Sequence, residues 1–287
     1  MQKTSDWLMS FTTQPRPNAR PAIGLAKPTT CVKVSITGGK GGVGKTSVAL
    51  RMAKELAGQG HRVLLLDCDT NLSNTAIKLG LPLDDTFWKL LSAEKDFREC
   101  IVRREGFDLL PACNGSVDLF ESQLALDEII IDIVSAHEHE YDWVLLDCPA
   151  GLDRASITLN AWCDHRVIVV TPDKSSITDS YSLVKILQTR FGIKENHLLV
   201  NMIQNDRQFQ KVVMTLSETI ENFLGCRTHV LGGLRKVDVS AEAFDTFFLS
   251  EEGSEWHKNF FKIVQQFAEK WGAGNISVRP AVEQEVH

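Results

Sequence analysis

Short apolar segments alternate along the chain with longer stretches in which apolar residues recur every three or four positions. The short segments are rich in Val, Ile and Leu and apolar at nearly every position, as in strands buried on both faces of a parallel sheet. Seven segments are predicted strands: Val32–Thr37, Val63–Asp67, Phe107–Leu110, Trp143–Asp147, Val167–Thr171, Leu198–Asn201 and His229–Leu231. Strand–helix alternation predicts a doubly wound α/β fold, with a mostly parallel sheet and helices on both faces.

One apolar stripe at helical spacing lies near the end of the chain and has two interpretations. Its members are Trp256, Phe260, Ile263, Val264, Phe267 and Trp271. The stripe could close the core of the domain, or it could attach the protein to a membrane surface. Surface-binding helices usually carry a basic polar face, whereas the lysines here are balanced by Glu255 and Glu269. This balance favours a core helix.

The same pattern divides the chain into three parts. Residues 1–30 contain four prolines among polar residues and are predicted to form a flexible N-terminal tail, because proline disfavours both helices and central strands. Within this tail, the apolar segment Trp7–Met9 fits either a docking peptide or no function. Residues 31–271 are predicted to form a single folded domain, and residues 272–287 a polar C-terminal tail.

Composition excludes several classes of protein. The chain has 287 residues, of which 43% are hydrophobic and 24% charged, which excludes a wholly disordered or a fibrous protein. The net charge of −6 disfavours a general nucleic-acid binder, since such binding depends on Lys and Arg. We also expect no membrane-spanning helix and no secretory signal. Seven widely spaced cysteines without a CxxC pair are typical of reduced thiols in a cytoplasmic protein.

The strongest local signal is a phosphate-binding loop. Its motif GxxxxGK[ST] is satisfied by Gly39, Gly44, Lys45 and Thr46, between a predicted strand and a predicted helix. The glycines allow backbone N–H groups to surround a polyphosphate. Lys45 can reach the β- and γ-phosphates, and the Thr46 hydroxyl can bind Mg²⁺. The predicted nucleotide-binding residues here are Gly39, Lys40, Gly41, Gly42, Val43, Gly44, Lys45, Thr46 and Ser47.

Acidic residues stand at the ends of two predicted strands. Asp67 ends the second predicted strand and Asp69 lies two residues beyond it, while Asp147 ends the segment Trp143–Asp147. Ligands of open α/β sheets gather at the carboxyl ends of the strands, and residues two apart on an extended segment point the same way. Both early aspartates could therefore face the phosphates, and Asp147 is suited to a position near Mg²⁺. The alternative for Asp67 and Asp69 is a cap on the next helix.

A second lysine, Lys40, gives the loop the form KGGxGKT. This loop resembles that of the deviant Walker-A P-loop ATPases of the MinD/ParA type, and the resemblance extends over about residues 31–271. It implies that Lys45 binds phosphates in its own site, and that Lys40 reaches the partner's phosphates across a nucleotide-sandwiched dimer. It also implies that Asp69 orients the attacking water and that Asp67 supports Mg²⁺ through its water shell.

Three further segments carry the resemblance. Residues 147–151 resemble the DxPAG switch of MinD, in which Gly151 would move when the γ-phosphate is lost. Asn201 stands where the family hydrogen-bonds adenine, and an amide offers the donor and the acceptor that the N6/N7 edge requires. Residues 171–185 resemble the TPEPTSITDAYALIK segment of the FlhG group, also called FleN or YlxH, which regulates flagellar number.

The resemblance implies an ATP-dependent switch with slow turnover. ATP and Mg²⁺ would drive a homodimer that binds partners, and hydrolysis to ADP and phosphate would return it to monomers. The partners implied are flagellar regulators: the SRP-type GTPase FlhF, a transcriptional activator or a C-ring component. Two features depart from the pattern. The FlhF-activating DQAxxLR segment is absent, and Asn71 and Ala76 replace family residues in the first switch.

Three alternatives stay open from the sequence. A MinD- or ParA-type positioning ATPase would act on the nucleoid or at the inner face of the cell membrane, and the charge of −6 argues against both. An ATP-dependent electron or metal carrier would need cysteines that bridge a cluster, for which Cys113 and Cys148 are the candidates. A binding module would use ATP only as a ligand and regulate a transcription factor.

Overall fold

The structure is a computed structural model that describes residues 31–69, 75–81, 86–111, 125–239, 247–250 and 253–272. Several sequence-based predictions lie outside these residues. They concern the tail of residues 1–30, residues 273–287, Asn71, Cys113 and the side chain of Ala76. The proposed boundaries of the P-loop domain therefore stay predictions.

The described strands form one eight-stranded sheet in the order β3-β4-β2-β5-β1-β6-β7-β8. Their bounds are β1 Val32–Thr37, β2 Val63–Asp67, β3 Val102–Arg104, β4 Phe107–Leu110, β5 Trp143–Asp147, β6 His165–Val170, β7 Glu195–Ile203 and β8 Arg227–Arg235. Every neighbouring pair is parallel except β3 and β4, which are antiparallel. The predicted mostly parallel, doubly wound α/β fold is confirmed.

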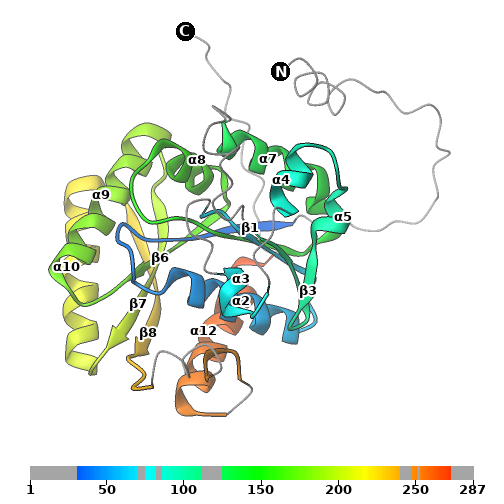
Figure 1. Cartoon of the computed structure of the whole chain (residues 1–287). Coiled ribbons are helices and arrows are strands. Elements are labelled where there is room, and N and C mark those ends of the chain that lie inside the picture. The colour runs from blue at the N-terminus through cyan, green and yellow to red at the C-terminus, as the bar shows by residue number, and fades with distance from the viewer. Residues whose placement is uncertain are drawn as a thin grey trace, which may run out of the picture.

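Helices cover both faces of this sheet (Figure 1). The longer ones are α2 Lys45–Gly58, α7 Leu126–His137, α8 Arg154–Trp162, α9 Lys174–Phe191, α10 Asp206–Leu224 and α12 Glu255–Trp271. Short helices are α3 Thr75–Lys78, α4 Thr86–Leu91, α5 Phe97–Cys100 and the 3-10 turn η1 Glu138–Glu140. One face packs against α2 and α12, whereas the other packs against α4, α5, α7 and α8 at one end and α9 and α10 at the other.

Burial of the central strands explains why their sequences are continuously apolar. All five residues of β2 and all five of β5 are buried, because helices cover both of their faces. The predicted segments Val63–Asp67 and Trp143–Asp147 match these strands residue for residue. The six cysteines among the described residues are free and buried, in agreement with the expected reduced thiols.

The C-terminal stripe forms part of the core. Phe260, Ile263, Val264 and Phe267 are buried on the side of α12 that packs against α2 and β8. Each such side chain stabilises the fold by roughly 1.5–3 kcal/mol when fully buried. The core-helix interpretation of this segment therefore agrees with the structure. Among the described residues, every helix falls short of the length and apolar character needed to cross a bilayer.

The structure differs from the predicted elements at the edges of the sheet. Strand β3 was not predicted, because it has only three residues and two of them are exposed arginines. Strands β7 and β8 are longer than the predicted segments Leu198–Asn201 and His229–Leu231. Their extra residues are largely polar, and the ladder between the two strands stabilises them as extended chain.

Candidate functional site

The glycine-rich loop joins the end of β1 to the start of α2. Gly42 and Gly44 have φ angles of 76° and 95°, in the left-handed region that favours glycine. A Cβ atom on Gly39 would overlap the backbone of Asp179 in α9. A Cβ atom on Gly44 would lie 2.5 Å from Nδ2 of Asn201. The loop therefore requires glycine at position 39 for reasons of space, and at position 44 for reasons of both space and conformation.

The two lysines of the loop point to different partners. Lys45 is buried, and its Nζ donates to the backbone oxygen of Lys40 at 3.4 Å. Burial lowers the pKa of Lys45, while the nearby Asp147 acts in the opposite direction. The half-exposed side chain of Lys40 instead reaches α9, where its Nζ lies 2.9 Å from Oδ1 of Asp173. A buried amine beside the loop backbone is well placed to exchange its carbonyl partner for a phosphate.

Two carboxylates lie side by side at the carboxyl ends of adjacent parallel strands. Asp67 of β2 and Asp147 of β5 are register partners, and both are buried. Thr75 binds both carboxylates: its backbone N–H donates to Asp67, and its hydroxyl donates to Asp147. Burial, followed by the neighbouring charge of Asp67, raises the pKa of Asp147 to about 8. The hydroxyl of Thr46 and the charge of Lys45 act in the opposite direction.

This acidic pair is suited to a hard divalent cation. Oδ1 of Asp147 is buried and accepts no hydrogen bond from any residue that the structure describes. Mg²⁺ prefers oxygen ligands and keeps several of its waters. A hydrated cation close to Thr46, Asp67 and Asp147 would satisfy this oxygen and relieve the repulsion between the carboxylates. The residues present therefore fit the predicted magnesium site.

Asp69 lies two residues after the end of β2. Its backbone N–H donates to Oδ1 of Asp67 at 3.0 Å, so the two aspartates share one short turn. The carboxylate of Asp69 also contributes to the electrostatic environment of Lys45 and of Asp147. The structure thus brings Asp69 near the loop, and its role in orienting water stays a prediction.

Asn201 contacts the loop directly. Its Nδ2 donates to the backbone oxygen of Val43 at 2.9 Å, and its Oδ1 accepts from the backbone N–H of Met202. Met202 has a φ of 58°, an unusual left-handed conformation for a residue with a side chain. An amide can make four hydrogen bonds, so Asn201 keeps one donor and one acceptor for a ligand.

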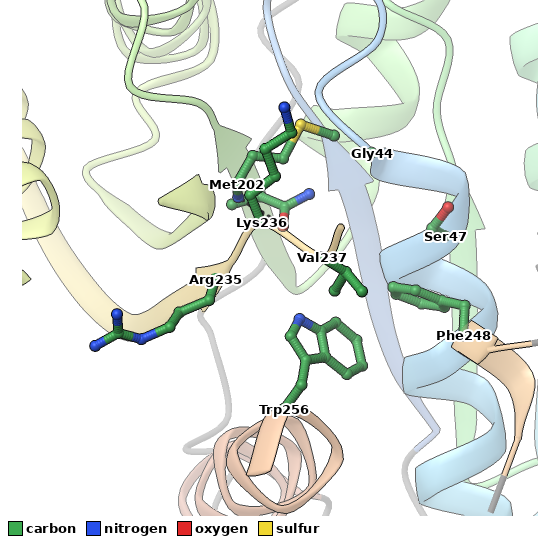
Figure 2. A pocket seen from close by; sticks show the side chains of 9 residues that line it. Gly44, Ser47, Met202, Arg235, Lys236, Val237, Phe248 and Trp256 are labelled. Atoms are coloured by element: carbon green, nitrogen blue, oxygen red, sulfur yellow. Dashed lines mark hydrogen bonds between the residues drawn. The ribbon is translucent and has the colours of Figure 1, made fainter. Parts of the chain in front are cut away.

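An open pocket of about 160 Å³ adjoins the loop (Figure 2). It begins at Gly44 and Ser47 and passes Asn201 and Met202. Residues 235–237, which are the last residue of β8 and the two that follow it, form its next wall. A molecule whose phosphates lie on the loop would extend naturally into this pocket, because the pocket opens where the loop becomes α2.

Comparison with known proteins identifies the family. Residues 31–216 match the family model AAA_31, described as an AAA domain. The chain belongs to this family. The AAA_31 match covers the phosphate-binding loop and both strands that carry the acidic pair.

Two curated relatives of this AAA_31 protein are similar over most of its length. The antiactivator FleN of Pseudomonas aeruginosa is 28% identical over 246 residues, which are 83% of this chain and 86% of that protein. The septum site-determining protein MinD of Bacillus subtilis is 29% identical over 196 residues, or 66% of this chain and 71% of that protein. The predicted resemblance to the MinD/ParA-type ATPases and to FleN is confirmed.

Solved structures support the fold. MinD of Pyrococcus horikoshii, solved as a complex with Mg-ADP, superimposes with a TM-score of 0.66 at 20% identity. That comparison covers 83% of this chain and 96% of the other. A complex of MinC and MinD from Aquifex aeolicus contains a chain that matches with a TM-score of 0.61 at 22% identity. The eight-stranded sheet of this AAA_31 protein is therefore that of the MinD P-loop fold.

Sequence reasoning missed several residues of the site. Asp173 had no assigned role, although it lies in the segment that carries the FlhG resemblance. Arg51 of α2, which donates to the backbone oxygens of Phe248 and Ser250, gives no signal in the sequence, because an arginine inside an amphipathic helix usually faces solvent. Trp256 was assigned only to the core, but it also lines the pocket. Helical spacing assigned Trp256 to the apolar face and could not indicate that this end of the helix meets the loop.

Proposed function

We propose that this chain is an ATP-hydrolysing molecular switch of the MinD/ParA type, which dimerises when it binds ATP. The observation that carries the proposal is the register pair of buried carboxylates, Asp67 and Asp147, beside a phosphate-binding loop with two lysines. A plain nucleotide-binding loop needs neither an orphaned buried carboxylate oxygen nor a second lysine.

The proposed phosphate site uses the loop itself. Backbone N–H groups from Gly39 to Ser47 would surround the phosphates, since the positive φ angles of Gly42 and Gly44 suit the tight curvature of such a loop. Lys45 would give up its bond to the Lys40 carbonyl and bind the β- and γ-phosphates. Thr46, Asp67 and Asp147 would hold Mg²⁺, which neutralises the charge that develops on the phosphates.

The proposed base site lies around Asn201. The amide would present its remaining donor and acceptor to the edge of adenine while it keeps its bond to Val43. Because the same side chain touches the loop, the base and the phosphates would be linked through one residue. The pocket beside Gly44 and Ser47 has enough room for a base.

Hydrolysis and dimerisation complete the proposed cycle. Asp69 would orient the attacking water, and its position beside Asp67 supports this role. Lys40 would leave Asp173 and reach the phosphates in the partner subunit. Loss of the γ-phosphate would then release both Lys40 and the switch at residues 147–151, and the dimer would separate.

The proposed cellular role is that of an FlhG/FleN-like regulator of flagellar number or placement. The similarity to FleN over 83% of the chain supports it. The proposed partners are FlhF, a transcriptional activator or a C-ring component, and the proposed location is the cytoplasm or the inner face of the cell membrane. The second candidate is a positioning ATPase that acts on membrane or nucleoid, which the similarity to MinD supports.

The structure gives little support to the alternative of an ATP-dependent electron or metal carrier. A metal cluster shared between two subunits needs cysteines at the surface, whereas Cys148 is only 1% exposed. The remaining alternative, a module that binds ATP without turnover, differs from the proposal in one measurable property. We therefore expect phosphate release from ATP by the wild type and none by Lys45→Ala.

A direct experiment tests the switch. Purified protein is mixed with Mg-ATP or Mg-ADP, phosphate release is followed, and the mass in solution is measured by light scattering. We expect slow ATP turnover and a dimer only with ATP. A monomer under all conditions would contradict the proposed switch. For the cellular role, Asp69→Ala protein held in its ATP state is tested for binding to each purified candidate partner.

A further inference from the structure

Two aromatic side chains form one wall of the pocket. In the sequence they are the lining residues farthest from the phosphate-binding loop. Trp256 comes from the first turn of α12, and Phe248 comes from the turn that precedes it. Figure 2 shows both rings beside Val237, on the side opposite Met202. The C-terminal helix thus reaches the candidate nucleotide site, although its sequence pattern indicates only a core helix.

Neighbouring rings fix the orientation of Trp256. Its ring stacks on Phe260 with centroids 5.4 Å apart and an angle of 19° between the planes. Phe248 meets the same ring edge-to-face, with centroids 4.7 Å apart. Phe260 and Phe248 are both buried, whereas Trp256 is only partly buried. The indole of Trp256 therefore packs against buried core residues on one side and lines the pocket on another.

The turn that carries Phe248 is tied to the helix that starts at the loop. Arg51 of α2 is buried and donates to the backbone oxygens of Phe248 and Ser250, at 2.9 and 2.7 Å. Lys54, one turn further along α2, donates to the backbone oxygen of Leu249 at 2.6 Å. Three successive carbonyl groups are thus anchored on α2. The aromatic wall therefore keeps a fixed position relative to the phosphate-binding loop.

The pocket has one apolar side and one polar side. Trp256 and Phe248 form the apolar side, and Asn201 offers one unused donor and one unused acceptor at the other. Heteroaromatic bases combine the same properties, with apolar faces and a polar edge. Contact between a base and an aromatic ring contributes in proportion to the area covered, so a two-ring purine gains more than a one-ring pyrimidine.

We propose that Trp256, supported by Phe248, contacts the base of the bound nucleotide and makes the site select purine over pyrimidine nucleotides. The proposal rests on the ATP binding proposed above and assigns to α12 a part in that binding. It places the specificity of the site in a segment more than 200 residues after the phosphate-binding loop.

Nucleotide affinities of variants test this proposal. Trp256→Ala and Trp256→Phe are compared with the wild type and with Trp271→Phe. Trp271 lies at the other end of the same helix and does not line the pocket, so its variant controls for general effects on α12. Dissociation constants are measured for ATP, CTP and inorganic tripolyphosphate, and thermal melting checks that each variant is folded.

We expect Trp256→Ala to bind ATP about 10- to 100-fold more weakly and to bind tripolyphosphate as the wild type does. Trp256→Phe keeps an aromatic ring at this position, so its affinity for ATP should lie between those of the wild type and Trp256→Ala. It should also stay folded even if the alanine variant does not. The ATP-to-CTP preference should fall in the same order, and Trp271→Phe should change neither quantity.

Two results would overturn the proposal. One is wild-type affinity for ATP in both Trp256 variants, and the other is equal affinity of the wild type for ATP and CTP. Failure of the wild type to bind either ATP or tripolyphosphate has a different meaning. It would contradict the proposed function itself, since the phosphate-binding loop would then hold no polyphosphate.

Discussion

Lys40 and Asp173 form an ion pair within one subunit, with 2.9 Å between Nζ and Oδ1. Asp173 is held in turn by the hydroxyls of Thr171 and Ser175 and by the backbone N–H of Ser176, which it caps at the start of α9. These bonds, together with the Lys40 pair, keep the pKa of Asp173 well below its usual range. The lysine proposed to act on the partner subunit therefore has a defined position within its own.

The first prediction follows from this pair. Asp173→Asn removes the charge but keeps a good helix cap, because Asn and Asp are nearly equivalent at that position. Less free energy would then be needed to move the Lys40 side chain away from residue 173. Since the pair is half-exposed, we expect ATP-dependent dimerisation to strengthen by at most about fivefold. Sedimentation at several protein concentrations measures this change, and a weaker dimer would contradict it.

The second prediction separates the two lysines. Lys45→Ala should abolish ATP binding, because it removes the buried amine beside the loop backbone. Lys40→Ala should bind ATP as the wild type does but remain monomeric, because within its own subunit the Lys40 side chain pairs with Asp173 and is assigned to the partner's phosphates. Equilibrium binding and light scattering check the pair of variants. An ATP-dependent dimer of Lys40→Ala would exclude the role in the partner subunit.

The third prediction concerns Asp69. Removing a group that positions the attacking water should slow hydrolysis by roughly 10²- to 10⁴-fold. ATP binding should survive, because Thr46, Asp67 and Asp147 remain. Asp69→Ala should therefore persist as an ATP-bound dimer in light scattering while the wild type returns to monomers. Turnover at the wild-type rate would mean that a different group orients the water.

The fourth prediction concerns stability at low pH. His197 of β7 is buried between His165 of β6, His229 of β8 and Trp271 of α12. Burial, followed by the charges of His165, His229, Arg166 and Lys270, lowers the pKa of His197 from its ordinary value of 6.5 to about 2. The unfolded chain therefore binds a proton below pH 6.5 that the folded chain does not. Stability is full above pH 6.5 and falls as the pH decreases from 6.5 toward 2.

One such proton costs about 1.4 kcal/mol of unfolding free energy for each pH unit in this range. His197→Phe keeps a ring in the cluster and removes the titrating group. We expect its urea unfolding free energy to fall less steeply between pH 6 and pH 4.5, by the equivalent of about one proton. The unfolding free energy is also measured at pH 8, where His197 is neutral in both the folded and the unfolded chain. A difference between the two proteins at that pH reports how well the new ring packs. Equal slopes for both proteins would show that His197 is protonated in the folded state.

The fifth prediction concerns α12. A chain ending at Ser254 loses the four buried apolar side chains of α12, worth together about 6–12 kcal/mol, against a usual net stability of 5–15 kcal/mol. Such a chain should unfold or aggregate. Removal of residues 273–287 alone should leave the melting temperature unchanged. A folded truncation that has only lost binding to liposomes would instead support a membrane-targeting helix.

Short-range sequence patterns predicted the centre of the sheet and suggested most residues of the candidate site. The loop from Gly39 to Ser47 and the aspartates at the ends of β2 and β5 are defined by neighbours a few residues away, so their spacing alone was informative. The bond from Arg51 to Ser250 spans 199 residues, and that from Lys40 to Asp173 spans 133. No local pattern indicates contacts of that kind, because they depend on how the helices lie on the sheet.

The contact between Gly39 and Asp179 has a mechanical consequence. No side chain fits between the phosphate-binding loop and α9, so the loop is able to widen only if α9 tilts away from it. The position of α9 and the shape of the phosphate-binding loop are therefore coupled through this contact. A protein that docks on α9 and tilts it would therefore shift the loop without touching the nucleotide, and the proposed ATP turnover would respond to an event at the surface of the helix.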